Sequence, residues 1–101
     1  MYIRGRMRYT WDASKNRRNM RVHGIDFTDA IRIFDGLTLE RVDDRFDYGE
    51  SRVYAVGEAN YVIITVIYSD RSDNERRIIS AWKAEPEERR AYLAWRYGRQ
   101  R

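Results

Sequence analysis

The sequence predicts an α+β fold with one antiparallel sheet, made of an N-terminal strand and a four-strand meander. From Thr38 onward, short segments rich in β-branched and aromatic residues follow one another with tight connections. Two segments with helical features precede them, and a third begins at Pro86. We therefore expect helices packed on one face of the sheet and a partly open opposite face.

The length and composition of the chain limit its organisation. With 101 residues the chain predicts a single domain, residues 1–101. Its core should be thin, because a domain of this size removes only about 65% of its unfolded surface from water. Hydrophobic residues at 43% and charged residues at 36% favour a folded, well solvated protein.

The absence of certain sequence features excludes some classes of protein. The chain has no cysteine, so we expect neither a disulfide nor a thiolate metal site. No apolar stretch resembles a signal peptide or reaches the roughly 18 residues that span a bilayer. We expect a cytoplasmic protein without membrane contact.

The first part of the chain predicts a strand followed by two helices. Residues Tyr2–Tyr9 alternate weakly between apolar and polar side chains, as a strand does. Asp12 is placed to cap a helix that ends at Gly24. A second, short amphipathic helix capped by Asp26 is expected up to Asp35, because its apolar residues recur three and four positions apart.

The second part of the chain predicts four strands and a final helix. The strands are the segments TLERVDD, SRVYAVGEA, YVIITVIYS and RRIISAWK, whose short connections imply antiparallel pairing. The segment YVIITVIY is apolar on both faces, which predicts a central position with cover on each side. The final helix begins at Pro86, and we expect it to bury Tyr92, Leu93 and Trp95.

Charge is unevenly distributed along the chain. Residues 1–34 carry +5, residues 35–75 carry −6 and residues 76–101 carry +5, around a net charge of +4. Two basic flanks around an acidic middle favour a localised anion site or a charged partner face over uniform phosphate binding. A DNA-binding domain is a weaker interpretation, because the acidic middle would repel a duplex. Solvated arginines without any site are the structural alternative.

Most enzyme classes leave a signature that this chain lacks. It contains no Gly-rich phosphate loop, no HExxH motif and no Ser/His/Asp set with defensible spacing. The remaining candidates are charged side chains on the predicted strands. Alternation along the last strand predicts that Arg77 and Lys83 share one face while Arg76 and Trp82 share the other.

Glu50, Arg52, Arg77 and Lys83 can converge on one face of the sheet if the central strand presents Thr65 or Tyr61 between them. Such a group suits metal-free cleavage of RNA through its own 2′-hydroxyl. That reaction needs a base, an acid, and donors placed where charge grows on the phosphoryl oxygens. Arginine suits the last role, because its planar, permanently charged fork holds two oxygens at once. A tyrosine or tryptophan can stack an unpaired base.

Each candidate also has a structural interpretation. His23, near a helix end, can serve as a cap. Glu50 and Arg52 can form a surface ion pair worth at most about 1 kcal/mol. Tyr54, Trp82 and the other aromatic side chains can belong to the core or its rim. Taken singly, none of these residues indicates an enzyme.

Three ordered blocks of the sequence resemble the BrnT family, the toxins of type II toxin–antitoxin pairs. The blocks are WDASKNRRNMRVHGIDFTDAIRIFD, DYGESRVYAVG and RRIISAWKAEPEERRAY, and they span Trp11 to Tyr92. The residues most specific to the resemblance are Asp12, Lys15, Asn19, His23, Gly24, Phe27, Gly49, Glu50, Arg52, Gly57, Arg77, Ile78, Ile79, Ser80, Ala81, Lys83, Glu88, Arg89 and Tyr92.

The resemblance implies a fold of the RelE and microbial-ribonuclease type and an activity. The expected activity is RNA cleavage that inhibits translation and arrests growth, with no cofactor and no metal. The expected partner is a small BrnA-like antitoxin with a ribbon-helix-helix part. Toxin and antitoxin are expected to form a hetero-oligomer that binds operator DNA through the antitoxin.

Residues and resemblance together predict a site. The expected catalytic residues are Glu50, Arg52, Arg71, Arg77 and His23, with the arginines on the phosphate and Glu50 or His23 moving protons. The expected RNA-binding residues are Arg76, Lys83 and Trp82.

The chain departs from the family pattern at two positions. Val22 stands where the family usually has lysine, and Trp82 where it has arginine. The second difference removes a candidate phosphate contact, which Arg76, Arg77 or Lys83 would have to replace. A weak or inactive toxin that still binds its antitoxin is therefore the alternative interpretation.

Overall fold

The computed structural model describes residues 2–45 and 47–98. Six strands form one sheet in the order β1-β2-β6-β5-β4-β3. The strands are β1 (Tyr2–Arg4), β2 (Met7–Thr10), β3 (Leu39–Val42), β4 (Val53–Ala59), β5 (Val62–Ser72) and β6 (Glu75–Lys83). The helices are α1 (Ala13–His23), α2 (Phe27–Ala30) and α3 (Pro86–Tyr97), with a 3₁₀ helix η1 (Ile31–Asp35) after α2. None of these helices is long and apolar enough to cross a bilayer.

The sheet is mixed, so the predicted purely antiparallel sheet is wrong. The predicted N-terminal strand is a hairpin of β1 and β2, which turns at Gly5 with φ of 61°. β2 then pairs in parallel with β6, while all other neighbouring strands are antiparallel. Because β2 and β6 are separated by most of the chain, no local pattern indicates the direction of their pairing.

The first two helices begin and end near the predicted residues. The Asp12 carboxylate accepts the backbone N–H groups of Ser14 and Lys15 at the start of α1, and Gly24 ends it with φ of 73°. Asp26 caps α2 in the same way. The predicted second helix is α-helical only as far as Ala30 and continues as η1.

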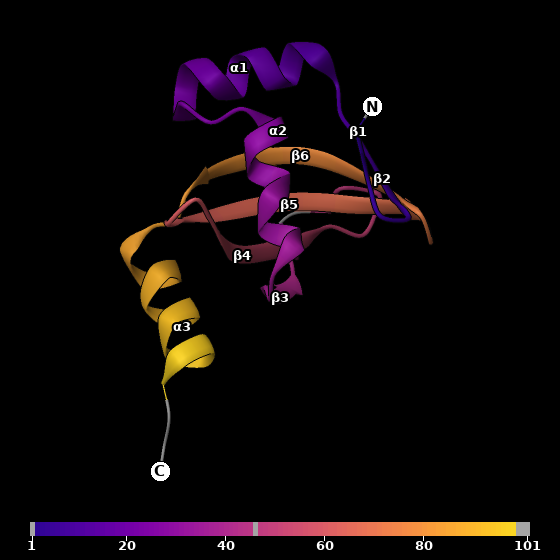
Figure 1. Ribbon diagram of the computed structural model, residues 1–101. Coiled ribbons are helices and arrows are strands. Elements are labelled where there is room, and N and C mark those ends of the chain that lie inside the picture. The colour runs from indigo at the N-terminus through magenta and orange to yellow at the C-terminus, as the bar shows by residue number, and fades with distance from the viewer. Residues whose placement is uncertain (1, 46, 99–101) are drawn as a thin grey trace.

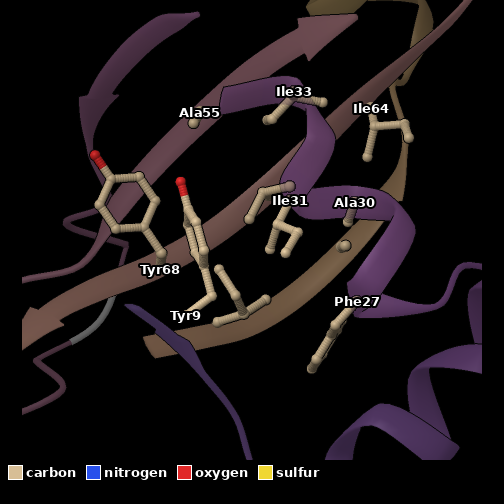
Figure 2. Close-up of a cluster of buried hydrophobic side chains, with 11 residues drawn as sticks. Tyr9, Phe27, Ala30, Ile31, Ile33, Ala55, Ile64 and Tyr68 are labelled. Carbon is tan, nitrogen blue, oxygen red and sulfur yellow. The ribbon is translucent and has the colours of Figure 1, made fainter. Parts of the chain in front are cut away.

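The core lies between the sheet and the segment formed by α2 and η1 (Figure 2). Phe27, Ala30, Ile31 and Ile33 are fully buried against residues of β2, β4, β5 and β6. β5 lies between β4 and β6, as its two apolar faces predict. A β-carbon at Gly57 would lie 2.8 Å from Cβ of Ile33, so only glycine permits this close approach of η1 to β4.

A bulge in β6 changes which of its side chains share a face. Ile67 pairs with Ser80 but the next residue, Tyr68, pairs with Ile78, so Ile79 is an extra residue. Ile78 and Ala81 are consequently both buried in the core although they are three positions apart. The predicted strict alternation along this strand is therefore wrong.

We call the side of the sheet turned away from α2 and η1 the open face. By register its side chains include those of Arg52, Tyr54, Val56, Thr65, Ile67, Ser69, Arg77, Ser80 and Trp82. Val56, Thr65, Ile67 and Ser69 are buried, so the accessible groups lie around them, with Arg71 beside Glu50. The bulge places Arg77 and Trp82 on this same face, where strict alternation would have separated them.

α3 packs on one end of the open face, so the expectation of helices on a single face is wrong. In Figure 1 this helix projects from the ends of the strands, on the opposite side of the molecule from α1. The Glu88 carboxylate in its first turn accepts hydrogen bonds from Tyr54, Thr65 and Trp82. Of the side chains expected to be buried, Tyr92 is buried, whereas Trp95 remains 47% exposed. Leu93 is half-buried.

α1 covers the part of the β6 edge that β2 leaves open (Figure 1). Pairing with β2 ends at Arg77. Beyond it, the buried Asn19 side chain of α1 donates to the carbonyl oxygen of Ala81 at 2.8 Å and accepts the Ala81 N–H at 3.1 Å. One side-chain amide thus replaces the peptide group of a neighbouring strand.

We predict that Asn19→Ala lowers the free energy of unfolding by about 3 kcal/mol, because both backbone groups of Ala81 lose their buried partner. Chemical denaturation followed by far-UV circular dichroism measures the change. Arg17→Ala on the exposed side of the same helix is the control and should change stability by less than about 0.5 kcal/mol. Equal stabilities of the two variants would contradict the role of Asn19.

Candidate functional site

An ionic cluster lies at the end of the open face where β4 begins and β5 ends. The Glu50 carboxylate accepts a hydrogen bond from Nε of Arg52 at 3.0 Å and lies 3.2 Å from Nη2 of Arg71. Arg52 comes just before β4 and Arg71 lies on β5. The structure thus brings together three of the predicted site residues.

The loop before β4 fixes Glu50 in this position. The Asp43 N–H donates to the carbonyl of Arg52 at 2.8 Å, which closes the loop at its base. The Asp47 carboxylate accepts the N–H of Gly49 at 3.1 Å, and Gly49 turns the chain with φ of 72°. Glu50 follows directly, so its carboxylate is positioned by the turn as well as by its two arginines.

Arg77 lies across the sheet from this cluster. Its register partner on β5 is Ser69, whose hydroxyl donates to the carbonyl of Ser51 at 2.9 Å. Arg77 therefore lies two strand spacings, about 10 Å, from the start of β4 and Arg52. Among residues 2–45 and 47–98, no acidic side chain forms an ion pair with Arg77. Its guanidinium group is available to an external anion.

A further ion pair, which the sequence did not predict, borders Arg77. Nη2 of Arg8 lies 2.6 Å from Oε1 of Glu75, because β2 pairs in parallel with β6 and places these residues opposite each other. The Arg8 hydrogen bond lowers the pKa of Glu75, and the charge of Arg71 contributes to the same shift. No local signal could have identified this pair, since 67 positions separate its members.

His23 and Trp82 lie at the other end of the open face. Their ring centroids are 5.9 Å apart, and the Trp82 indole N–H donates to Glu88 at 3.1 Å. Trp82 pairs with Thr65 of β5, whereas Arg77 pairs with Ser69. The two side chains are therefore four residues apart along the sheet, a separation of roughly 13 Å. The structure therefore does not bring His23 together with Glu50.

Arg76 and Lys83 also lie apart from the ionic cluster. Arg76 points to the core side, where it bonds Asp70 at 2.8 Å and stacks on the Tyr68 ring at 3.9 Å. Lys83 is exposed at the far end of β6, in register with the core residue Ile64. The predicted convergence of Lys83 with Arg77 is wrong, because the bulge at Ile79 separates their faces.

A cleft lies between α3 and the strands β3 and β4. It has a volume of about 480 Å³, and its lining includes Arg41, Tyr54 and Glu88. The guanidinium groups of Arg41 and Arg45 lie 4.9 and 5.4 Å from the centroid of the Tyr54 ring. Burial and the hydrogen bond to Glu88 raise the pKa of Tyr54 to about 12, so this phenol stays protonated at neutral pH.

The open face therefore combines two chemical capacities. At one end, Arg71 and Arg77 supply cations beside the carboxylates of Glu50 and Glu75. Such a group can hold a phosphate and accept a proton. At the other end, aromatic rings lie where an unpaired base could stack. Within the described ranges, no three His, Asp or Glu side chains are grouped so as to hold a metal ion.

Two comparisons with known proteins find matches. A family model described as "Ribonuclease toxin, BrnT, of type II toxin-antitoxin system" matches residues 11–88. The crystal structure of the Brucella abortus ribonuclease toxin BrnT is similar, with 30% sequence identity and a TM-score of 0.60. That match covers 78% of this chain and 97% of the Brucella chain. Among curated proteins, no sequence matches.

We predict that Glu88→Gln destabilises the protein in a pH-dependent way. Burial alone would raise the Glu88 pKa, but hydrogen bonds from Tyr54, Thr65, Trp82 and the backbone outweigh it and lower the pKa. Because the pKa is lowered in the folded protein, the ionised carboxylate stabilises the fold at pH values above the ordinary glutamate pKa, near 4.3. This stabilisation is lost as the pH falls through the pKa of Glu88 in the folded state.

At pH 7 the variant should lose about 2 kcal/mol of unfolding free energy, and the difference from wild type should shrink below about pH 4. Urea denaturation at several pH values measures both effects. Glu87→Gln, one exposed position earlier in the same helical turn, is the control and should show neither effect. A pH-independent loss at Glu88 would contradict the role of its charge.

Proposed function

Because the chain belongs to the BrnT family of ribonuclease toxins of type II toxin–antitoxin systems, we propose that it is an endoribonuclease that cleaves RNA without a metal ion. The observation that carries the proposal is the position of Arg77 across the open face from Glu50, Arg52 and Arg71. Among the described residues, Arg77 forms no ion pair with an acidic side chain. This arrangement suits a phosphodiester held between strands.

In the proposed reaction the arginines bind the scissile phosphate and Glu50 accepts the proton of the adjacent 2′-hydroxyl. The 2′-oxygen forms a bond to phosphorus, the bond from phosphorus to the 5′-oxygen breaks, and the leaving oxygen takes up a proton from water, while Glu50 returns the proton that it accepted to solvent. Arg77 and Arg71 stabilise the negative charge that develops on the non-bridging oxygens. The products are a 2′,3′-cyclic phosphate and a 5′-hydroxyl.

The position of His23 favours Glu50 as the base. His23 lies beside Trp82, roughly 13 Å along the sheet from Arg77, whereas Glu50 contacts two of the arginines. In this proposal His23 and Trp82 contact a base of the substrate, while Arg76 and Lys83 lie outside the site.

The biological setting is part of the proposal. Cleavage of RNA would inhibit translation in the cytoplasm and arrest growth, and a cognate antitoxin of the ribbon-helix-helix type would neutralise the toxin. The toxin–antitoxin assembly, rather than the toxin alone, would bind operator DNA. The family membership supports the existence of an antitoxin.

A second candidate is a toxin of low activity that retains antitoxin binding. It is favoured by the ion pairs within the cluster, since Glu50 engages Arg52 and Arg71 while Glu75 engages Arg8. The indole of Trp82 moreover donates to Glu88 and supplies no positive charge. In this case the open face would bind RNA weakly.

We predict that Arg77→Ala reduces RNA cleavage by about 100-fold or more, because a donor to the developing charge is lost. Gel analysis of a labelled RNA in the presence of EDTA measures the rate and identifies the cyclic-phosphate product. Lys83→Ala, on the same strand but outside the cluster, is the control and should keep wild-type activity. Cleavage that requires a divalent metal would contradict the proposed mechanism.

We predict that expression of this chain without its antitoxin stops growth and that expression of the Arg77→Ala variant does not. The variant should still bind the antitoxin, because it retains the fold. Growth curves after induction and co-purification with the neighbouring antitoxin gene product measure the two properties. Harmless expression of the folded wild-type protein would favour the second candidate.

A further inference from the structure

The outer side of α1 carries three arginines. With about 100° of rotation per residue, Arg17, Arg18 and Arg21 fall within an arc of about 100°. The opposite side of the helix holds Asn16 and Asn19, whose side chains bond to Asp26 and Ala81. The arginines therefore point away from the fold, and all three are exposed. We call them the α1 ridge.

The ridge is not neutralised by nearby acids. Asp12 caps the start of α1 and Asp26 caps α2, so both carboxylates are bound to backbone N–H groups. Asp29 is exposed on α2. Among the residues that the structure describes, none of these acids forms an ion pair with a ridge arginine. The ridge therefore presents three positive charges to solvent.

The ridge continues from the candidate site. α1 lies along the outer edge of β6, the strand that carries Arg77 (Figure 1). The last residue of α1, His23, contacts the Trp82 ring on the open face. A strand of RNA that leaves the open face across β6 would therefore meet α1 next.

We propose that the α1 ridge binds phosphates of the RNA that flanks the scissile linkage, so that the protein holds a longer RNA segment than its catalytic cluster can contact. The inference rests on the proposed ribonuclease function. Guanidinium groups bind phosphate oxygens through two parallel hydrogen bonds, which matches the composition of the ridge.

The ridge suits a nucleic acid better than a protein. Arginine is common in protein interfaces too, but there it surrounds or accompanies an apolar, fully buried core. The exposed apolar side chains of α1, Met20 and Val22, flank the ridge on its two opposite sides and form no common patch. The ridge itself is a row of cations, which a polyanion complements.

Salt dependence separates the ridge from the catalytic cluster. When a protein binds a single-stranded nucleic acid, the logarithm of the affinity falls linearly with the logarithm of the salt concentration. The slope is about −0.7 for each phosphate contact. With about four contacts at the cluster, a short RNA should give a slope near −3; three further contacts at the ridge should give a slope near −5 for a longer RNA.

The test compares two variants that differ only in the place where two charges are lost. Arg17→Gln/Arg18→Gln removes adjacent, exposed arginines from α1. Arg89→Gln/Arg90→Gln removes adjacent, exposed arginines from α3, the other long helix. Fluorescence anisotropy with 2′-O-methyl oligonucleotides of 5 and 20 nucleotides measures binding without cleavage, and circular dichroism verifies that both variants fold.

The ridge variant should bind the 20-nucleotide probe several-fold more weakly at low salt, with a slope reduced in magnitude by about 1.4. It should bind the 5-nucleotide probe and cleave a short RNA as the wild type does. The control variant should keep wild-type binding of both probes.

Three results would overturn the inference. These are an unchanged slope in the ridge variant, an equal loss in the control variant, and loss of antitoxin binding with unchanged affinity for long RNA. The last result would assign the ridge to a protein partner. If the wild type cleaves no RNA, the proposed function fails, but the slopes still decide whether the ridge binds RNA.

Discussion

The fold depends on the contact between the Asn19 side chain and the backbone of Ala81. β6 is paired by β2 only along its first residues, so its later peptide groups would otherwise lie unpaired beneath α1. An amide side chain has one donor group and one acceptor, as a peptide group has, and it satisfies both without another strand. This contact attaches a helix with almost no apolar inner face, and thereby positions His23 and the ridge relative to the sheet.

The open face separates charge from aromatic surface. At one end, Glu75 is paired with Arg8 of β2, and Glu50 is paired with Arg52 and with Arg71 of β5. Arg77 lies near these pairs and, in the described part of the chain, has no acidic partner of its own. Around Trp82, rings pack against one another and against Glu88. An RNA linkage needs both kinds of surface, one for its phosphate and one for its base.

Much of this structure follows from local sequence, and the remainder depends on non-local pairing. The caps at Asp12 and Asp26, the stop at Gly24 and the meander strands are local features, and the sequence predicts them. The parallel pairing of β2 with β6 joins distant segments and was missed, and with it the pair Arg8–Glu75. The extra residue Ile79 shifts the period of β6, which is why Lys83 was wrongly placed beside Arg77. Glu50, Arg52 and Arg71 do lie together, in ion pairs that include the Glu50–Arg52 surface pair allowed by the sequence.

The attachment of α3 through Glu88 has a mechanical consequence. One carboxylate receives donors from β4, β5 and β6 and from the backbone of its own helical turn, whereas the later residues Trp95 and Tyr97 remain largely exposed. The far half of the helix is held as well, because Tyr92 is fully buried and the Tyr97 hydroxyl donates to Glu58 at 3.0 Å. Any tilt of the helix would also displace the Glu88 carboxylate, so the position of α3 and the orientation of the Tyr54 and Trp82 rings are coupled.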